Sequence, residues 1–370
     1  MHPSDESDAL HARVQAFISA SLDSRPTEPF DDLALAIARF QARHVPAIAR
    51  LGRARAVDFD RAALAAEIPA VPTDVFRLAR IAAHQASDDV ALFRTSGSTQ
   101  GKEARGEHPL RRTDTYAMGA LAWGRRFLFP DRDRMRAIIL APPPAELPDS
   151  SLGFMLDLFA RALGGAASYH LREGTLDTAS VEAAATLARS AGDPVIVLAT
   201  SFALVHLLEA SPRGDLRLPE GSRAMQTGGF KGRSREVAPD ELRREVSALF
   251  DMPESHVVAE YGMTELSSQL YEATLATALG HHDGPAHHGV YRAPPWMRVT
   301  AVDPGSLAPL PDGEAGLGRI VDLCNVDSAV AIQTADRVRV LPEGVALLGR
   351  APGAVPRGCS IAIDEMLGRG

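Results

Sequence analysis

The chain has 370 residues, 45% of them hydrophobic, which is enough to build one large domain with a smaller one attached. Its 39 basic and 47 acidic side chains give a net charge of -8, and no basic run offsets that balance, so we expect no nucleic-acid partner. Two cysteines, an acidic start and no apolar run long enough for a bilayer predict a cytoplasmic protein without a membrane span.

The first three predicted elements are helices, because apolar residues recur at helical spacing with Asp or Thr near the starts of residues 9–20, 30–51 and 74–83. Beyond a polar loop, helices alternate with short buried strands. The helices are predicted at 113–128, 150–163 and 179–191, and the strands at 137–140, 166–171 and 195–198. Such alternation predicts a mostly parallel sheet covered by helices, with ligand-binding loops at the carboxyl ends of its strands.

After Pro294 and Pro295 the pattern changes to short alternating strands separated by glycine-containing turns. They are predicted at 297–302, 318–323, 330–333, 337–341 and 345–348. The sequence therefore predicts an α/β fold with a core over 1–294, a β-rich subdomain over 295–348 and a mobile C-terminal tail over 349–370.

The polar loop at 95–102 combines small hydroxyl residues and glycines, and it ends in a lysine. Gly97 and Gly101 let the backbone approach an anion, and side-chain donors come from Thr95, Ser96, Ser98, Thr99 and Lys102. It is not a Walker loop, because only three residues separate the glycines and Glu103 follows the lysine. Composition alone leaves a phosphate site and a polar surface turn equally open.

A second motif follows an apparent strand, in a turn that presents an aromatic ring, a hydroxyl and a carboxylate: Tyr261, Gly262, Thr264 and Glu265. Together the two motifs resemble the adenylate-forming superfamily, which includes acyl-CoA synthetases and nonribosomal adenylation domains. The resemblance implies that the polar loop orders the phosphates of ATP. It also implies that Tyr261 packs on adenine, Thr264 meets the alpha phosphate and Glu265 holds Mg2+, which neutralises charge during attack on phosphorus.

Two further motifs follow in the order in which they occur in this superfamily. Asp336 closes a Thr-Ala-Asp triplet, and the resemblance implies that its carboxylate accepts hydrogen bonds from the ribose hydroxyls. Arg350 follows Gly349 at the position of the hinge before the C-terminal domain, and it is implied as a second nucleotide contact. Ala335 stands where the family has glycine, which leaves the backbone conformation there open.

The resemblance also implies a further domain of roughly a hundred residues after the hinge, carrying a catalytic lysine. The chain ends at Gly370, so we expect neither that domain nor its lysine. Lys231 follows Gly228 and Gly229, which bring backbone close to a ligand, and it is a candidate to stabilise charge on the alpha phosphate instead. An exposed lysine without a catalytic role is the alternative.

The glycine- and proline-rich tail carries Cys359 close to Arg357, and a nearby cation favours the nucleophilic thiolate. The tail and residues 225–232 resemble the acyl-protein synthetase (LuxE-type) family, in which a fatty acid is adenylated, moved to a cysteine near the C-terminus and collected by a reductase. The resemblance implies that Cys359 is the acyl acceptor. A small buried residue is the alternative.

Two other groups of side chains are expected to have no part in the chemistry. Cys324 follows an apolar strand pattern and is predicted to be an inert interior thiol. Four histidines suggest a metal, but they flank an Asp-Gly-Pro turn without cysteine or glutamate at ligand spacing, so an exposed loop is favoured: His281, His282, His287 and His288.

These observations predict an ATP- and Mg2+-dependent, AMP-forming ligase for a carboxylic acid, with a fatty acid and an acyl reductase or other acyl-accepting protein implied by the resemblance. Two alternatives stay open. One is an acyl-CoA ligase of the phenylacetate-CoA ligase kind, which uses a soluble thiol and is indifferent to Cys359. The other is a non-catalytic protein that binds nucleotide or serves as a scaffold.

Overall fold

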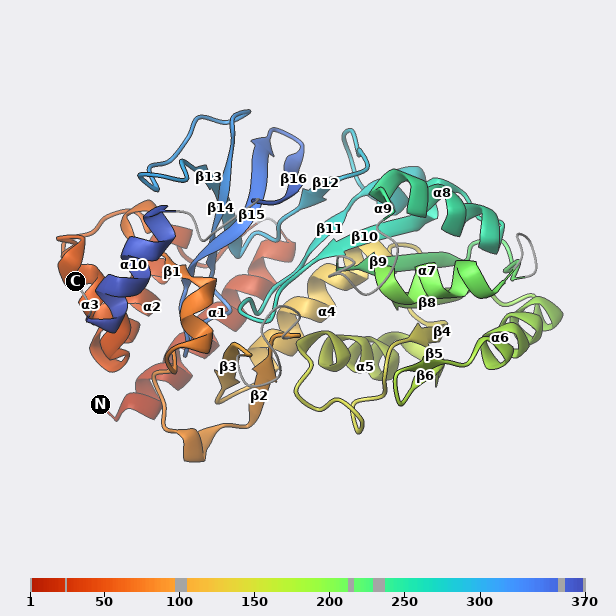
Figure 1. The fold of residues 1–370 in the computed structure, drawn as a ribbon, viewed down its shortest axis with the longest axis horizontal. Helices are drawn as coiled ribbons and strands as arrows, with labels where there is room; N and C mark the ends of the chain where they lie inside the picture. Colours follow the sequence, from red (N-terminus) through yellow and green to blue (C-terminus); the bar gives the residue numbers. More distant parts are fainter. Residues whose placement is uncertain are drawn as a thin grey trace. The chain divides into compact units, whose positions relative to one another are not determined.

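The computed structural model describes residues 2–23, 25–96, 105–211, 216–228, 237–351 and 357–368. They form two units. Figure 1 shows the chain coloured along its sequence. Unit 1 comprises Met1–Ala122, Met263–Ser268 and Ala293–Gly370, and unit 2 comprises Trp123–Gly262 and Gln269–Arg292. No helix in the described residues combines the length and apolarity needed to cross a bilayer. The domain boundaries predicted after residues 294 and 348 stay predictions.

Unit 2 is built on a mostly parallel sheet in the order β12-β11-β10-β9-β8-β4-β5. The pairs from β5 to β10 are parallel, whereas β10–β11 and β11–β12 are antiparallel. The strands are β4 (Met135–Leu140), β5 (Gly164–Tyr169), β8 (Val195–Thr200), β9 (Arg223–Thr227), β10 (Val257–Tyr261), β11 (Leu270–Glu272) and β12 (Val290–Arg292), with a separate hairpin of β6 (Leu171–Arg172) and β7 (Thr175–Leu176). The predicted parallel sheet is thus confirmed.

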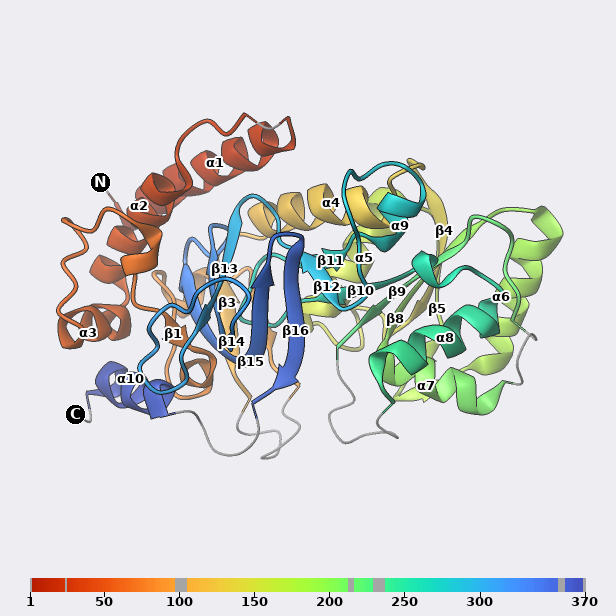
Figure 2. The same ribbon diagram turned by 90° about the horizontal axis from the view of Figure 1, so that it is seen from above.

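Helices cover both faces of this sheet because its central strands are apolar on both sides. Val195 and Val197 of β8 pack with buried residues of three helices on one face, and Figure 2 shows α5 on the other face. The helices of unit 2 are α5 (Ser151–Leu163), α6 (Thr178–Ala191), α7 (Ser201–Ala210), α8 (Pro239–Phe250), α9 (Thr274–Ala278) and the 3-10 turn η5 (Glu254–His256). The predicted helices at 150–163 and 179–191 are confirmed within a residue.

A buried ion pair lies within unit 2, between α8 and β11. The guanidinium of Arg243 donates to both carboxylate oxygens of Glu272, at 2.7 and 2.8 Å, and Glu272 also accepts from the backbone N–H of Ala259 at 3.0 Å. Burial by itself raises the pKa of Glu272, but a hydrogen bond from His288 and the charge of Arg243 hold that pKa below its usual value. The pair therefore connects a covering helix, the sheet and the histidine-containing loop.

We expect Arg243→Met to lower the free energy of unfolding by about 3–5 kcal/mol, because it leaves the Glu272 carboxylate buried without its cation. Arg244 is the matched control, since it is the next residue of the same helix and is exposed. Arg244→Met should change the free energy by less than about 0.5 kcal/mol. Denaturant unfolding of the three proteins measures both values, and equal stability of the two variants would contradict the assignment.

Unit 1 contains an antiparallel sheet in the order β13-β14-β15-β16, with β1 paired parallel to β15. A separate antiparallel hairpin joins β2 and β3. The strands are β1 (Val71–Pro72), β2 (Ala91–Arg94), β3 (Glu107–Leu110), β13 (Met297–Val302), β14 (Ala315–Asp322), β15 (Ala331–Leu341) and β16 (Gly344–Arg350). Two strands predicted at 330–333 and 337–341 are wrong as separate elements, because β15 runs through both with a bulge near Asp336.

The helices of unit 1 are α1 (Pro3–Leu22), α2 (Phe30–His44), α3 (Pro46–Ala54) and α10 (Arg357–Leu367), with 3-10 turns η1 (Ala65–Glu67), η2 (Thr73–Arg77) and η3 (Ala86–Asp88). α4 (Asp114–Leu128) confirms the helix predicted at 113–128 and has residues in both units. The single helix predicted at 30–51 is wrong. Pro46 restricts Val45 to an extended conformation (φ -113, ψ 99), so α2 ends before it and α3 begins at the proline. The helix predicted at 74–83 is only the short turn η2.

The C-terminal segment differs from the loose tail that we predicted. Residues Arg357–Leu367 form α10, which lies beside α3 in both views (Figure 1 and Figure 2). Arg50 donates to the carbonyl of Met366, and Arg55 bonds the carboxylate of Glu365 at 2.8 Å. The apolar residues of this segment recur at helical spacing, and these contacts hold the resulting helix against α3.

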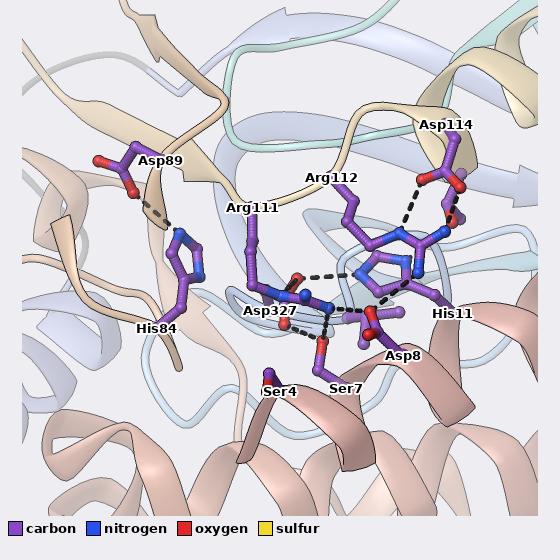
Figure 3. Close-up of polar contacts among 12 residues, drawn as sticks. Ser4, Ser7, Asp8, His11, His84, Asp89, Arg111, Arg112, Asp114 and Asp327 are labelled. Atoms are coloured by element: carbon purple, nitrogen blue, oxygen red, sulfur yellow. Dashed lines mark hydrogen bonds and ion pairs between the residues drawn. The ribbon is translucent and has the colours of Figure 1, made fainter. Parts of the chain in front are cut away.

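A buried polar network joins α1 to the segment after β14. Asp327 accepts from the hydroxyl of Ser7 and bonds Nε2 of His11 at 2.9 Å, while Nδ1 of His11 lies 2.8 Å from the hydroxyl of Thr115 (Figure 3). Arg111 donates to Ser7 at 2.7 Å. The carboxylate lies between the serine and the histidine, which is not the order of a nucleophilic triad, so the network has a structural role.

Candidate functional site

In the sequence the polar loop connects β2 and β3, and these two strands pair as an antiparallel hairpin. Phe93 pairs with His108 and Arg94 with Glu107, and Thr95 continues the ladder through its N–H, which donates to the carbonyl of Gly106 at 2.9 Å. The N–H of Gly106 in turn donates to the Thr95 hydroxyl at 2.8 Å. The base of the loop is therefore fixed by Thr95, whose hydroxyl oxygen accepts a hydrogen bond within the hairpin.

Much of the predicted phosphate site lies outside the described residues. Ser96 is described, but Gly97, Ser98, Thr99, Gly101 and Lys102 are not, and the same holds for Gly229 and Lys231. The roles predicted for those residues stay predictions. What the structure adds is the anchor of the loop, namely the hairpin that carries it.

The second motif follows β10 and continues into the loop 263–268, which belongs to unit 1. His108 of β3 lies 2.6 Å from the carbonyl oxygen of Thr264, through its Nδ1. Burial lowers the pKa of His108 to about 4, although this hydrogen bond favours the charged form. The neutral imidazole therefore joins the hairpin of the polar loop to the residue predicted to meet the alpha phosphate, across 156 positions of sequence.

The loop 263–268 is also held from the other side, by the segment that follows β14. Asn325 donates to the carbonyl of Glu265 at 2.9 Å. Asp322 accepts from the N–H of Ser267 at 3.0 Å and from the hydroxyl of Ser268 at 2.8 Å. Burial raises the pKa of Asp322 to about 6, and hydrogen bonds from Ser268, Cys324 and Ser267 oppose that rise. The backbone around Glu265 is thus fixed by side chains from distant parts of unit 1.

Tyr261 ends β10 in unit 2, and its ring meets that of Tyr291 edge to face with centroids 6.4 Å apart. The preceding Glu260 is buried and hydrogen-bonds the hydroxyl of Thr227, its partner on β9. Burial raises the pKa of Glu260 to about 7, and the bond from Thr227 works in the opposite direction. A Cβ at Gly262 would approach Oε1 of Glu260 to 2.6 Å, so a side chain at this position would have to displace the Glu260 carboxylate.

Gly228 follows β9 with φ of +75°, a conformation that favours glycine, and its carbonyl accepts from the hydroxyl of Ser201 at 2.9 Å. Its position at the carboxyl end of a parallel strand, beside the end of β10, fits the general location of ligand-binding loops.

Asp336 and Arg350 are directly opposite each other on β15 and β16 of unit 1. The register shifts between Asp336 and Val338, and Gly349 has φ of +83°. Ala335 is not among the residues with positive φ, so alanine in place of glycine introduces no strain there. The structure brings together two residues that the sequence places 14 positions apart, and their nucleotide contacts stay predictions.

The two cysteines have similar surroundings although we predicted different roles for them. Cys324 is buried, as predicted, and burial raises its pKa well above the usual value. Cys359 is also buried, with 4% of its surface exposed, and it packs on α10 against Val302 and Leu317. Burial, followed by the charge of Asp74, raises the pKa of the Cys359 thiol to about 11. In this conformation Cys359 is a buried thiol and not the thiolate that its neighbour Arg357 suggested.

The four histidines lie in the predicted turn between α9 and β12. His281 and His287 are exposed, and His282 meets the ring of Phe127 with centroids 5.9 Å apart. Within the described residues no group of three or more His, Cys, Asp or Glu side chains is placed to hold a metal.

Sequence reasoning missed four side chains that organise these motifs: His108, Glu260, Asp322 and Asn325. Glu260 gave a readable signal, since it is a carboxylate at the end of an otherwise apolar strand pattern. The others gave none, because the groups of the loop 263–268 that they bond lie far away in sequence.

A magnesium–ATP complex suits the donors that the described motifs supply. Glu265 offers a carboxylate oxygen, the kind of ligand that Mg2+ takes in small number while it keeps phosphate and water. Its backbone and that of Thr264 are held on both sides by Asn325 and His108. Such fixation is what an ion-binding carboxylate requires.

No protein-family model matches the sequence, and no curated protein matches it. Solved structures share the fold. A 2-hydroxyisobutyryl-CoA ligase in an open conformation, in complex with 2-HIB-AMP and CoA, superposes with a TM-score of 0.62 at 13% identity, over 86% of this chain and 74% of that one. The same ligase in its postadenylation state gives a TM-score of 0.61 at 12% identity, over 86% and 67%.

ATP-bound MatB from Rhodopseudomonas palustris gives a TM-score of 0.50 at 18% identity, over 72% of this chain and 49% of that one. The present chain thus spans about half the length of the MatB structures that it matches. These similarities show that the chain has the fold of adenylate-forming ligases, as the sequence predicted.

We expect Glu260 to make the stability of the protein depend on pH. Its pKa is about 7 when folded against 4.5 for the free side chain, so between these values the unfolded chain releases a proton that the folded chain keeps. The contribution of Glu260 to the free energy of unfolding is complete below its unfolded pKa and is lost as pH rises through its folded pKa. The loss is at most about 1.4 kcal/mol per pH unit. Glu260→Gln removes it.

Urea unfolding of both proteins at pH 5, 6, 7 and 8 measures this effect. The free energy of the wild type should fall relative to that of Glu260→Gln as pH rises. A difference that does not change with pH would show that Glu260 titrates normally.

Proposed function

We propose that this protein activates a carboxylic acid with ATP, forming an acyl-adenylate and releasing pyrophosphate. One observation carries the proposal. The β2–β3 hairpin carries the polar loop at 95–102, which we call the Ser/Thr/Gly loop. The hydrogen bond of His108 joins this hairpin, within unit 1, to the loop 263–268 that contains Thr264 and Glu265. The described base of the first segment therefore contacts the second, and both lie in a fold shared with a CoA ligase that was solved with adenylates bound.

The residues have the following roles in the proposed reaction. Thr95 anchors the loop that orders the phosphates, and Thr264 contacts the alpha phosphate. A carboxylate oxygen of the acid attacks the alpha phosphorus, the bond to the bridging oxygen breaks, and its electron pair leaves with pyrophosphate. Glu265 would hold Mg2+, and the ion would supply positive charge that neutralises the phosphates. Tyr261, Asp336 and Arg350 hold adenosine.

The acceptor of the acyl group is a separate part of the proposal. In the self-acylation that the sequence suggests, the thiolate of Cys359 attacks the carbonyl of the adenylate and AMP leaves. The buried thiol with its raised pKa requires that α10 first leave its position on β13 and β14. A carrier protein or reductase would then collect the acyl group, and a fatty acid is the proposed substrate.

Transfer to a soluble thiol such as CoA is the second candidate for this step, and the burial of Cys359 favours it. It needs no movement of α10. The ligases with the same fold include one bound to both an adenylate and CoA.

Pyrophosphate exchange into ATP, with an acid that supports it, tests the adenylation step. Glu265→Gln should lower the exchange rate roughly 100-fold, because a neutral amide replaces the charge that holds the ion. Raising the Mg2+ concentration should recover part of the loss. Glu182→Gln, at an exposed position of α6, is the matched control and should exchange normally. Normal exchange by Glu265→Gln would remove this residue from the site.

The thiol acceptor is tested by mass spectrometry after incubation with ATP, Mg2+ and the acid. Self-acylation predicts a hydroxylamine-sensitive mass increase that is absent in Cys359→Ser. Gly358→Ala should accelerate it, because a Cβ there would lie 2.7 Å from Leu307 Cγ and 3.1 Å from the Gly305 carbonyl, which displaces the start of α10. CoA-dependent AMP release that Cys359→Ser leaves unchanged would decide for the soluble acceptor.

A further inference from the structure

We propose that His108 is a positioning residue for the adenylation step, which fixes the backbone of Thr264 relative to the hairpin that carries the Ser/Thr/Gly loop. The catalytic part of this inference rests on the proposed function. The structural part, a histidine held in one tautomer that orders the loop 263–268, can be tested by itself.

The partner of His108 determines its tautomer. A carbonyl oxygen only accepts hydrogen bonds, so the 2.6 Å contact requires a proton on Nδ1 of His108. The neutral ring then carries its lone pair on Nε2. The ring is fully buried and meets Phe76 edge to face with centroids 5.8 Å apart. His108 is therefore a neutral donor with one orientation, and its charge does not change in the neutral pH range.

Stability alone does not account for this side chain. Nε2 is buried and has no hydrogen-bond partner among the described residues. A net hydrogen bond contributes about 1 kcal/mol, whereas a buried polar atom without a partner costs about 1–3 kcal/mol. The two effects offset each other, so the histidine adds little to the free energy of folding. What it does provide is a directional bond between two loops.

The bond acts on the chemistry through short backbone connections. His108 lies two residues after Gly106, whose N–H and carbonyl both pair with Thr95 at the base of the Ser/Thr/Gly loop. On the other side it holds the carbonyl of Thr264, and Asn325 holds the next carbonyl, that of Glu265. Two consecutive peptide units are fixed by two side chains, and only His108 comes from the hairpin.

Substitution of His108 by asparagine or glutamine tests where the donor must lie. The side-chain amide nitrogen of Asn reaches the position of Nδ1 and can replace the hydrogen bond to Thr264, whereas that of Gln reaches the position of Nε2 and cannot. We expect His108→Asn to keep kcat for pyrophosphate exchange within about threefold. His108→Gln should lower kcat roughly 100-fold, the cost of a misplaced reacting group, while KM for ATP changes less than about threefold. Equal kcat losses in both variants would overturn the assignment.

A matched control is His256 in unit 2, whose Nδ1 binds the carbonyl of Ser222 at 2.9 Å and which is also buried. His256→Gln removes a bond of the same kind away from the motif loops. It should lower thermal stability without the selective loss of kcat. A kcat loss in His256→Gln as large as that in His108→Gln would show that the effect is a general consequence of weakened packing.

Two measurements need no turnover. The two-bond proton–nitrogen NMR spectrum of the histidine rings should show the Nδ1-protonated tautomer for the signal that disappears in His108→Asn. Hydrogen exchange at the amide of Ser267, which bonds Asp322, should be faster in His108→Gln than in wild type or His108→Asn. An Nε2-protonated ring, or unchanged exchange in His108→Gln, would overturn the proposal. If no acid supports pyrophosphate exchange in the wild type, the proposed function fails and these two results still decide the role of His108.

Discussion

The loop 263–268, which contains Thr264 and Glu265 and is called the motif loop below, is held in place by the buried segment from Asp322 to Val330. Asp322 and Asn325 hold the loop 263–268 through its backbone and through Ser268. The segment is itself held by α2, since Gln41 donates to the carbonyls of Asn325 and Val326 and accepts from the N–H of Val330. α1 and the end of β3 add the Asp327 network of Figure 3. The N-terminal helices are therefore part of the support for the site in unit 1.

Polar side chains hold these interior segments because several of them bond more than one backbone group: Gln41 bonds three and Asn325 bonds two. A side chain that bonds a backbone carbonyl fixes the chain direction, whereas apolar packing alone leaves a polar loop free to choose among conformations. The cost is visible in the pKa values: about 6 for Asp322 and about 4 for His108. Both shifts arise from burial. A site in which one carboxylate is to bind a metal ion and one side chain is to contact phosphate needs its backbone held in this way.

The sequence predicted the parallel sheet and the helices at 113–128, 150–163 and 179–191 because apolar periodicity records burial, but it did not predict α7, α8, α9 or α10. It also singled out Gly228, whose positive φ accounts for glycine at that position. Supporting residues such as His108 and Asn325 could not be identified from the sequence. They bond backbone carbonyls of residues far away in the chain, and any residue type has such a carbonyl. The tail was misjudged for a related reason: glycine and proline before Cys359 suggested mobility, whereas contacts of Arg50 and Arg55 with α10 depend on the fold.

The central claim is that ATP activates a carboxylic acid at the motif loop of this chain. The most direct measurement is pyrophosphate release by the wild-type protein with ATP and Mg2+ across a panel of carboxylic acids, from short hydroxy acids to long-chain fatty acids. The account predicts acid-dependent release of pyrophosphate, with AMP formed in equal amount once a thiol acceptor is present. Tight binding of ATP without pyrophosphate release for any acid would contradict it.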